Sequence, residues 1–300
     1  MSIDPFTVEA RAEKSNAGIK FGRNCFASVS PKSAFLHQMR YSAKFDSMTQ
    51  GNVLITGAAT RIGRAIALAL GAMGWGVVVH HNRSKSAADD VVAEIENVGS
   101  RALSCAADLA DPGQTRDLML EAADAFGTIH CLINNAALFE RDNIETLDRE
   151  SWGAHLSINL TAPLMLTQAF ARQLSGDAKG NVINIIDQRV WNPTPHFISY
   201  TLSKAGLWTM TQTLALALAP RIRVNGIGPG PTLPSLRQTD SEFEEQWQAL
   251  PLRRRTALKD IVDAVHYILG PGAMTGQMIA LDGGQHLSWA PARPNQVTKE

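Results

Sequence analysis

The sequence has no excess of charge of either sign, because 28 basic and 28 acidic side chains balance across 300 residues. This balance gives no reason to expect nucleic acid or an anionic membrane surface as a partner. The chain also lacks an apolar run close to the roughly 20 residues that a membrane span requires, so no membrane association is expected. With 45% apolar residues, the composition predicts a soluble globular protein of one large domain or two small ones.

Cysteine is scarce, and its three positions show no Cys-x-x-Cys spacing. No zinc site can be read from the sequence, and we expect no metal. Cys105 and Cys131 fall inside expected strands, which favours buried, reduced thiols in a cytoplasmic protein.

The first 47 residues differ from the rest of the chain in lacking periodicity and in mixing Ser, Lys and Arg with few acids. Their opening, Ser2–Thr7, resembles a leader left by a cloning vector. The remainder resembles an upstream extension or, less favoured, a targeting peptide. We expect residues 1–47 to be disordered, residues 48–290 to form the catalytic domain, and residues 291–300 to be a C-terminal tail.

From residue 48 onward, short apolar runs alternate with longer stretches of helical periodicity. The runs predict strands at Asn52–Thr56, Gly76–His80, Ala102–Ala106, Ile129–Ile133, Asn181–Ile186, Ile222–Ile227 and Gln277–Leu281. Helices are expected to begin near Arg61, Ser86, Gln114, Arg149, Phe197 and Lys259. This alternation predicts an α/β fold with one seven-stranded parallel sheet covered by helices on both faces. Ligands bind such sheets beyond the carboxyl ends of the strands.

A glycine-spaced turn, Thr56-Gly57-Ala58-Ala59-Thr60-Arg61-Ile62-Gly63, follows the first expected strand. Gly57 permits a tight turn, Gly63 permits close packing of helix on strand, and the amides near Ile62 favour a diphosphate. Arg61 replaces the middle glycine of the usual fingerprint. Its guanidinium could reach phosphate or an anionic edge of the substrate, or could simply be solvated at the helix start.

The end of the second expected strand indicates which dinucleotide binds. NAD sites place an acid roughly 20 residues past the glycines to hold the ribose, but here the sequence is His80-His81-Asn82-Arg83-Ser84. Arg83 and Ser84 offer charge and a hydroxyl to a 2′-phosphate, so NADP(H) is favoured, with surface solvation as the alternative for Arg83. Asp108 and Leu109 close the third strand where adenine would lie, although an ordinary helix-start acid would look the same.

Tyr200 and Lys204 are four residues apart in an expected helix, Phe197–Leu218. This spacing places the phenol and the ammonium on one helix face. A neighbouring cation lowers the pKa of a tyrosine, so the pair suits proton transfer near neutral pH. Two unrelated side chains on an amphipathic helix are the alternative.

These motifs occur together in a familiar order. They are Thr56-Gly57-x3-Arg61-x-Gly63, Asn134-Asn135-Ala136, Asn159, Tyr200-x3-Lys204 and Pro229-Gly230. In this order they resemble the short-chain dehydrogenases/reductases over roughly residues 50–288. The resemblance implies a single doubly wound Rossmann domain, a homotetramer and a small-molecule substrate.

The resemblance also implies a role for each matching residue. Tyr200 would be the catalytic acid, and Lys204 would hold the nicotinamide ribose and lower the pKa of the tyrosine. Asn159 would anchor a water of a proton relay, and Asn135 would line the cofactor. The Pro229-Gly230 turn and Thr232 would face the nicotinamide amide.

One position departs from the family pattern. Asp187 stands thirteen residues before the tyrosine, where the family places its active-site serine. A carboxylate there would oppose the negative charge that develops on a ketone oxygen, whereas it suits protonation at nitrogen. The chain therefore resembles the pteridine reductase branch, which includes dihydromonapterin and dihydrofolate reductases, in Asp187, in Arg61 and in the ending Asp282-Gly283-Gly284-x-His286-Leu287. Phe139 matches the aromatic of that branch that stacks on the pterin, although a loop hydrophobe is the alternative.

We therefore expect NADPH-dependent reduction of a C=N bond that converts a dihydropterin or dihydrofolate to its tetrahydro form. Tyr200 and Asp187 would supply the proton, Phe139 would stack on the ring, and Arg61 would bind its polar edge. Residues 231–250 are expected to form a loop over the substrate. The alternatives are a general carbonyl or 3-oxoacyl reductase and a non-enzymatic NADP(H)-sensing protein. The intact Tyr200/Lys204 pair argues against the sensor.

Overall fold

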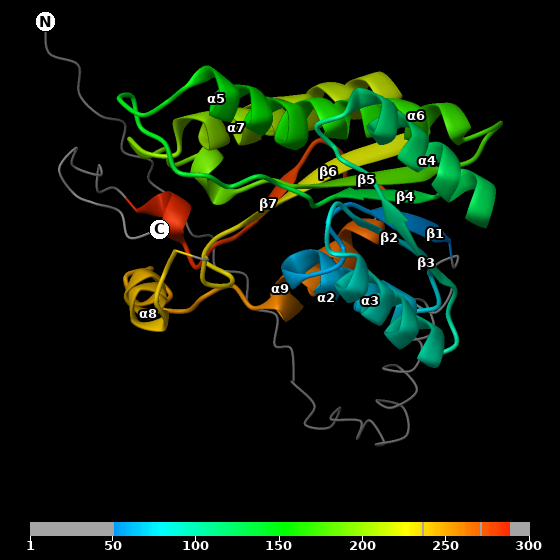
Figure 1. Ribbon diagram of the computed structural model, residues 1–300, viewed down its shortest axis with the longest axis horizontal. Helices are drawn as coiled ribbons and strands as arrows, with labels where there is room; N and C mark the ends of the chain where they lie inside the picture. Colours follow the sequence, from blue (N-terminus) through cyan, green and yellow to red (C-terminus); the bar gives the residue numbers. More distant parts are fainter. Residues whose placement is uncertain (1–50, 236, 271, 289–300) are drawn as a thin grey trace, which may run out of the picture. The chain divides into compact units, whose positions relative to one another are not determined.

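Seven parallel strands form one sheet in the order β3-β2-β1-β4-β5-β6-β7 (Figure 1). The strands are β1 (Asn52–Ile55), β2 (Gly76–His81), β3 (Ala102–Ala106), β4 (Cys131–Asn134), β5 (Gly180–Ile185), β6 (Ile222–Pro229) and β7 (Met278–Leu281). The order runs outward in two directions from the neighbours β1 and β4, which is the doubly wound topology. The predicted single α/β domain with a seven-stranded parallel sheet is confirmed. The structure is a computed structural model and describes residues 51–235, 237–270 and 272–288.

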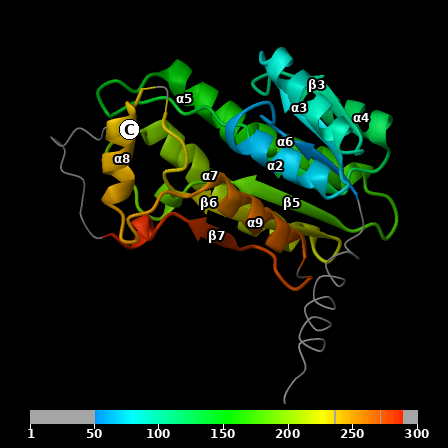
Figure 2. The ribbon, with the colours of Figure 1, turned by 90° about the horizontal axis from the view of Figure 1, so that it is seen from below.

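Helices cover both faces of the sheet (Figures 1 and 2). One face carries α2 (Arg61–Ala72), α3 (Lys85–Asn97) and α9 (Leu258–Leu269), and α2 and α9 lie side by side in Figure 2. The other face carries α4 (Pro112–Phe126), α5 (Arg149–Leu156), α6 (Ala162–Gln173) and α7 (Ile198–Leu218). Among the described residues, no helix has both the length and the hydrophobicity that a membrane crossing needs.

The core divides into two layers because successive strand residues point to opposite faces. Val53 and Ile55 of β1 pack with α2, α3 and α9, whereas Leu54 between them packs with α4 and α6. All three side chains are fully buried. Burial on both faces explains why the strands are continuous apolar runs, without the alternation of a half-exposed sheet.

Two stretches differ from the expected elements. The helix expected from Arg149 contains a π-helical segment, Ser157–Thr161, between α5 and α6. The expected loop at 231–250 contains the helix α8 (Asp240–Gln248), so the expectation of a loop without regular structure was wrong, whereas its place over the substrate stays a prediction. Thr239 and Glu242 form a capping box, in which each side chain bonds the backbone amide of the other residue, and this stabilises the start of α8. Residues 1–47 and 291–300 lie outside the described residues, so their assignments stay predictions.

Candidate active site

A cleft of about 870 Å³ lies at the carboxyl ends of β1, β4, β5 and β6. Most of the predicted site residues line it, namely Gly57, Arg61, Ile62, Asn135, Phe139, Asp187, Tyr200, Lys204, Pro229, Gly230 and Thr232. Gly63 and Asn159 are buried and are not part of this lining. A second hollow of about 560 Å³, between α2 and α3, lies away from these strand ends and shares only Arg61 with the predicted residues. The larger cleft is therefore the candidate active site.

The phenol of Tyr200 donates a hydrogen bond of 2.8 Å to Asp187 Oδ2. Lys204 follows one helical turn later on α7, and its ammonium lies 5.9 Å from the centre of the tyrosine ring. Lys204 Nζ also donates to the carbonyl of Ile185 at the end of β5, at 2.7 Å. The structure thus brings a phenol, a carboxylate and an ammonium together, as the sequence predicts.

Lys204 is almost fully buried, and this burial lowers the pKa of its ammonium to about 8. The nearby carboxylate of Asp187 acts in the opposite direction and partly restores the pKa. Lys204 therefore keeps its proton at neutral pH, in a site where little solvent screens its charge. A cation so placed suits the predicted hold on a ribose hydroxyl.

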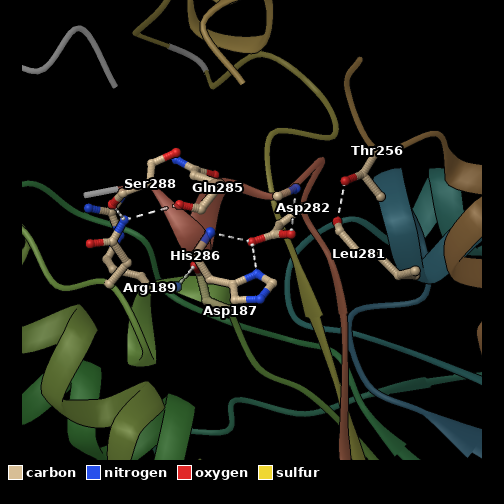
Figure 3. Close-up of polar contacts among 10 residues, drawn as sticks. Asp187, Arg189, Thr256, Leu281, Asp282, Gln285, His286 and Ser288 are labelled. Atoms are coloured by element: carbon tan, nitrogen blue, oxygen red, sulfur yellow. Dashed lines mark hydrogen bonds and ion pairs between the residues drawn. The ribbon is translucent and has the colours of Figure 1, made fainter. Parts of the chain in front are cut away.

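Asp187 begins the turn that follows β5, and its Oδ1 accepts the backbone amide of Arg189 at 2.7 Å. Arg189 is buried, lines the cleft, and donates from Nη1 to Thr194 Oγ1 at 2.8 Å. The same turn contacts the chain segment Gln285–Leu287, whose His286 bonds the carboxylate of Asp282 just before it (Figure 3). Arg189 was not among the predicted site residues, although its place two residues after Asp187 was the available signal.

Asn159 lies in the π-helical segment, a feature often found at functional sites. Its Oδ1 accepts the amide of Leu138 at 2.8 Å, and its Nδ2 donates to the carbonyl of Leu138 and to Ser203 Oγ, both at 3.0 Å. Asn159 therefore ties the loop before Phe139 to α7. Its predicted role as the anchor of a water stays a prediction.

The glycine turn is built by close backbone approaches. Gly57 has φ +63°, and a Cβ on it would lie 3.0 Å from Ala136 Cα. A Cβ on Gly63 would lie 2.2 Å from the carbonyl oxygen of Gly57. Asn135 fastens the turn, since its Nδ2 donates to the carbonyls of Thr56 and Gly57 at 2.8 and 3.0 Å. This cradle leaves room for backbone amides to approach a diphosphate, as a dinucleotide requires.

His80, at the end of β2, supports the same turn. Its Nδ1 accepts the amide of Gly57 at 3.0 Å, so its proton resides on Nε2, which donates to the carbonyl of Ala107 at 3.1 Å. Burial lowers the pKa of His80 to about 4; the Ala107 carbonyl opposes this shift and neighbouring His81 adds to it. A neutral imidazole is thus part of the turn. This role of His80 was not predicted, because the bond joins residues 23 positions apart in the sequence.

Arg61 occupies a left-handed conformation with φ +54°, which explains why a glycine suits this position in the usual fingerprint. Its guanidinium donates to the carbonyls of Leu233 and Pro234 at 3.3 and 3.0 Å. From the segment after β6, Arg237 donates to the carbonyl of Phe139 at 3.0 Å. Two arginines therefore hold the segment after β6 against the cleft.

Phe139 lies in the cleft with its ring parallel to that of Phe197, at 4.6 Å between centres and 2° between planes. It also meets the ring of Tyr200 edge to face at 4.7 Å. An aromatic side chain beside the phenol can support a flat substrate, so the predicted stacking role is geometrically possible and stays a prediction.

The residues predicted for the adenosine end lie outside the cleft lining. Arg83 and Ser84 are exposed at the start of α3. Asp108 accepts the amide of Ala110 at 2.9 Å, and Leu109 is buried. Their roles stay predictions. In the part of the chain that the structure describes, no cluster of three or more His, Cys, Asp or Glu side chains is placed to hold a metal.

The doubly wound sheet, the glycine turn and the paired Tyr200 and Lys204 define a nucleotide-dependent oxidoreductase. The family description "short chain dehydrogenase" matches residues 51–245, and the chain belongs to this family.

Solved structures and curated proteins give more particular similarities. The alternative dihydrofolate reductase FolM of Brucella canis, solved with NADP, is 46% identical, with a TM-score of 0.79 over 83% of this chain and 98% of that chain. A short chain dehydrogenase of Burkholderia cenocepacia, also solved with NADP, is 31% identical, with a TM-score of 0.74 over 80% and 99%. A 3-oxoacyl-[acyl-carrier-protein] reductase of Synechocystis is 32% identical over 79% of this chain and 98% of its own length.

Proposed function

We propose that this protein uses NADPH to reduce a C=N bond of a pteridine, converting a dihydropterin or dihydrofolate to the tetrahydro form. The observation that carries the proposal is the 2.8 Å hydrogen bond from Tyr200 to Asp187. The similarity to FolM dihydrofolate reductases at 46% identity supports the same substrate class.

The cofactor is NADP(H), as the sequence predicts, because similar proteins of this family are solved with NADP. The residues present fit this cofactor: the cradle of Gly57 and Gly63 suits the diphosphate, and buried Lys204 suits the ribose. When bound, NADPH supplies the hydride to the ring carbon.

Side chains of the protein then supply the proton. Tyr200 donates to the ring nitrogen, and the carboxylate of Asp187 holds the phenol in place and stabilises the cationic centre that forms during C=N reduction. Phe139 supports one face of the substrate ring, and Arg61 binds its polar edge. Holding two flat rings face to face removes orientation entropy from the reaction.

A carbonyl or 3-oxoacyl reductase is the second candidate, favoured by the similarity to the Synechocystis enzyme. The two candidate functions favour different side chains at residue 187. A carboxylate opposes the oxyanion that develops from a ketone, whereas a serine hydroxyl donates a hydrogen bond to it.

The first prediction compares wild type with Asp187→Ser. NADPH oxidation is measured with dihydrobiopterin, dihydromonapterin and dihydrofolate, and with a panel of ketones and 3-oxoacyl thioesters. We expect wild type to reduce the pterins and Asp187→Ser to lose roughly 100-fold or more of kcat/KM, the size of effect typical of a lost proton-transfer group.

Asp111→Ser is the matched control. Asp111 caps α4 outside the cleft, and serine caps helices about as well, so its pterin turnover should equal that of wild type. Ketone turnover alone, retained or raised in Asp187→Ser, would replace the proposal with the carbonyl reductase. NADPH binding without turnover of either class would favour the sensor.

A further inference from the structure

The helix that carries Tyr200 has no cap of its own. Phe197, at the N-cap position of α7, has φ +58° and makes no capping bond with its side chain. A bulky residue rarely adopts this left-handed conformation, so the surrounding structure must enforce it. The first amides of a helix also need acceptors from elsewhere.

Asp142 supplies those acceptors from more than 50 residues upstream. Its carboxylate accepts the amides of Ile198 and Ser199 and the hydroxyl of Ser199, the Ser199 amide at 3.2 Å. Its backbone carbonyl accepts the amide of Phe197 at 2.8 Å. Asp142 is 3% exposed, so water does not satisfy these groups in its place.

His155 completes this buried network. Its Nε2 accepts the amide of Glu140 at 3.1 Å, so the ring proton resides on Nδ1. Nδ1 lies 2.9 Å from both the carbonyl of Ser151 and the hydroxyl of Ser199. The Ser199 hydroxyl can thus accept from His155 while it donates to Asp142. None of the three side chains lines the cleft, and serine stands between the acid and the base, which excludes a nucleophilic triad.

We propose that Asp142 is a positioning residue that holds the substrate-stacking side chain and the catalytic acid in register. Phe139 is on the same loop as Asp142 and stacks on Phe197, the residue whose backbone Asp142 fixes. Tyr200 follows Ser199 directly and meets the ring of Phe139. One carboxylate therefore determines the position of both Phe139 and Tyr200. The inference rests on the proposed function for the identity of the substrate.

The test uses Asp142→Asn in the full chain. The amide keeps the shape of the carboxylate, but whichever way it turns, an NH₂ group faces an N–H or O–H donor of α7. We expect the single-turnover rate of hydride transfer to fall roughly 10- to 100-fold, because an error of about 1 Å in geometry can cost this much. KM for the pterin should rise, and the NADPH Kd should stay within about twofold, because the glycine turn does not contact Asp142.

A second readout needs no substrate and so separates failure of this inference from failure of the proposed function. Tyrosine ionisation is followed by ultraviolet difference titration, and Tyr200→Phe isolates one of only three tyrosines. In Asp142→Asn the midpoint of Tyr200 ionisation should differ from that of wild type, because the phenol loses its fixed distance to Lys204 and Asp187. A folded variant with an unchanged midpoint and an unchanged rate would overturn the inference.

Three further variants test whether the effect is purely structural. Asp111→Asn makes the same acid-to-amide change at the N-cap of α4, outside the cleft, and should leave the single-turnover rate unchanged. If Asp142→Asn does not fold, Ser199→Ala removes only the hydroxyl link and should lower the rate, while Ser199→Thr, which keeps the hydroxyl, should restore it. Equal rates in Ser199→Ala and wild type would count against the inference.

Discussion

At the scale of single residues, Asp187 and His80 carry the least expected chemistry. Asp187 pairs with the phenol of Tyr200 at the point where the family pattern has a serine. His80 is buried and neutral, and its imidazole accepts the amide of Gly57 in the turn that is predicted to bind the diphosphate. In each case a hydrogen bond that a backbone or hydroxyl group could also make is made by a titratable side chain.

The neutral His80 predicts a pH dependence of stability. Its folded pKa of about 4 lies below the unfolded value of 6.5, so the unfolded chain binds more protons between these values. The stability is fully present above pH 6.5 and is lost as pH falls toward 4, at a slope of at most about 1.4 kcal/mol per pH unit. Urea unfolding across this range should show a weaker slope in His80→Gln than in wild type. Equal slopes would contradict the assignment.

At the scale of elements, the turn between β1 and α2 depends on the absence of side chains. A Cβ on Gly63 would lie 2.2 Å from the carbonyl oxygen of Gly57 and 2.5 Å from Asn135 Nδ2, and neither group can withdraw without breaking the turn. The end of β1 and the start of α2 can therefore approach each other only because residue 63 is a glycine.

Gly63→Ala should weaken NADPH binding at least tenfold and lower the free energy of unfolding by about 1–3 kcal/mol, as overpacking does. Gly153→Ala is the matched control, because a Cβ on Gly153 in α5 would meet nothing within 4 Å. In that control, alanine should leave stability equal or raise it by about 0.5–1 kcal/mol. Fluorescence titration and urea unfolding measure the two effects, and wild-type affinity in Gly63→Ala would refute the assigned role of Gly63.

At the scale of the whole molecule, the cleft is made by the ends of strands that are distant in the sequence. Its lining comes from the residues after β1, β4, β5 and β6 and from α7. A ligand that spans the cleft is therefore expected to bind the folded state only. The homotetramer and the cytoplasmic location belong to this scale too, and both stay predictions.

NADPH should accordingly stabilise the protein against unfolding, by about 2.7 kcal/mol at a concentration roughly 100 times its Kd. NADH at the same concentration should stabilise it less, since it lacks the 2′-phosphate that Arg83 is predicted to bind. Arg83→Gln should reduce the difference between the stabilisation given by NADPH and that given by NADH. Thermal unfolding with each cofactor measures this, and a difference that is unchanged in Arg83→Gln would remove Arg83 from the predicted site.

The sequence by itself determined the seven strands, the glycine turn, the Tyr200/Lys204 pair and the carboxylate of Asp187 where the family has a serine. These are recognisable because each depends on local periodicity or on a spacing of a few residues. The helix α8 was also readable from the capping pattern of Thr239 and Glu242 but was not predicted.

Only the tertiary structure decided how distant groups meet. His80 holds Gly57 across 23 residues, Arg61 fixes the segment at Leu233 across 172, and Asp142 caps the helix of Tyr200 across more than 50. These bonds follow from the order in which the parallel strands pair. That order brings the carboxyl ends of β1, β2, β4 and β5 close together on one side of the sheet. No local pattern records that order, because it is set by burial of both faces of the sheet at once.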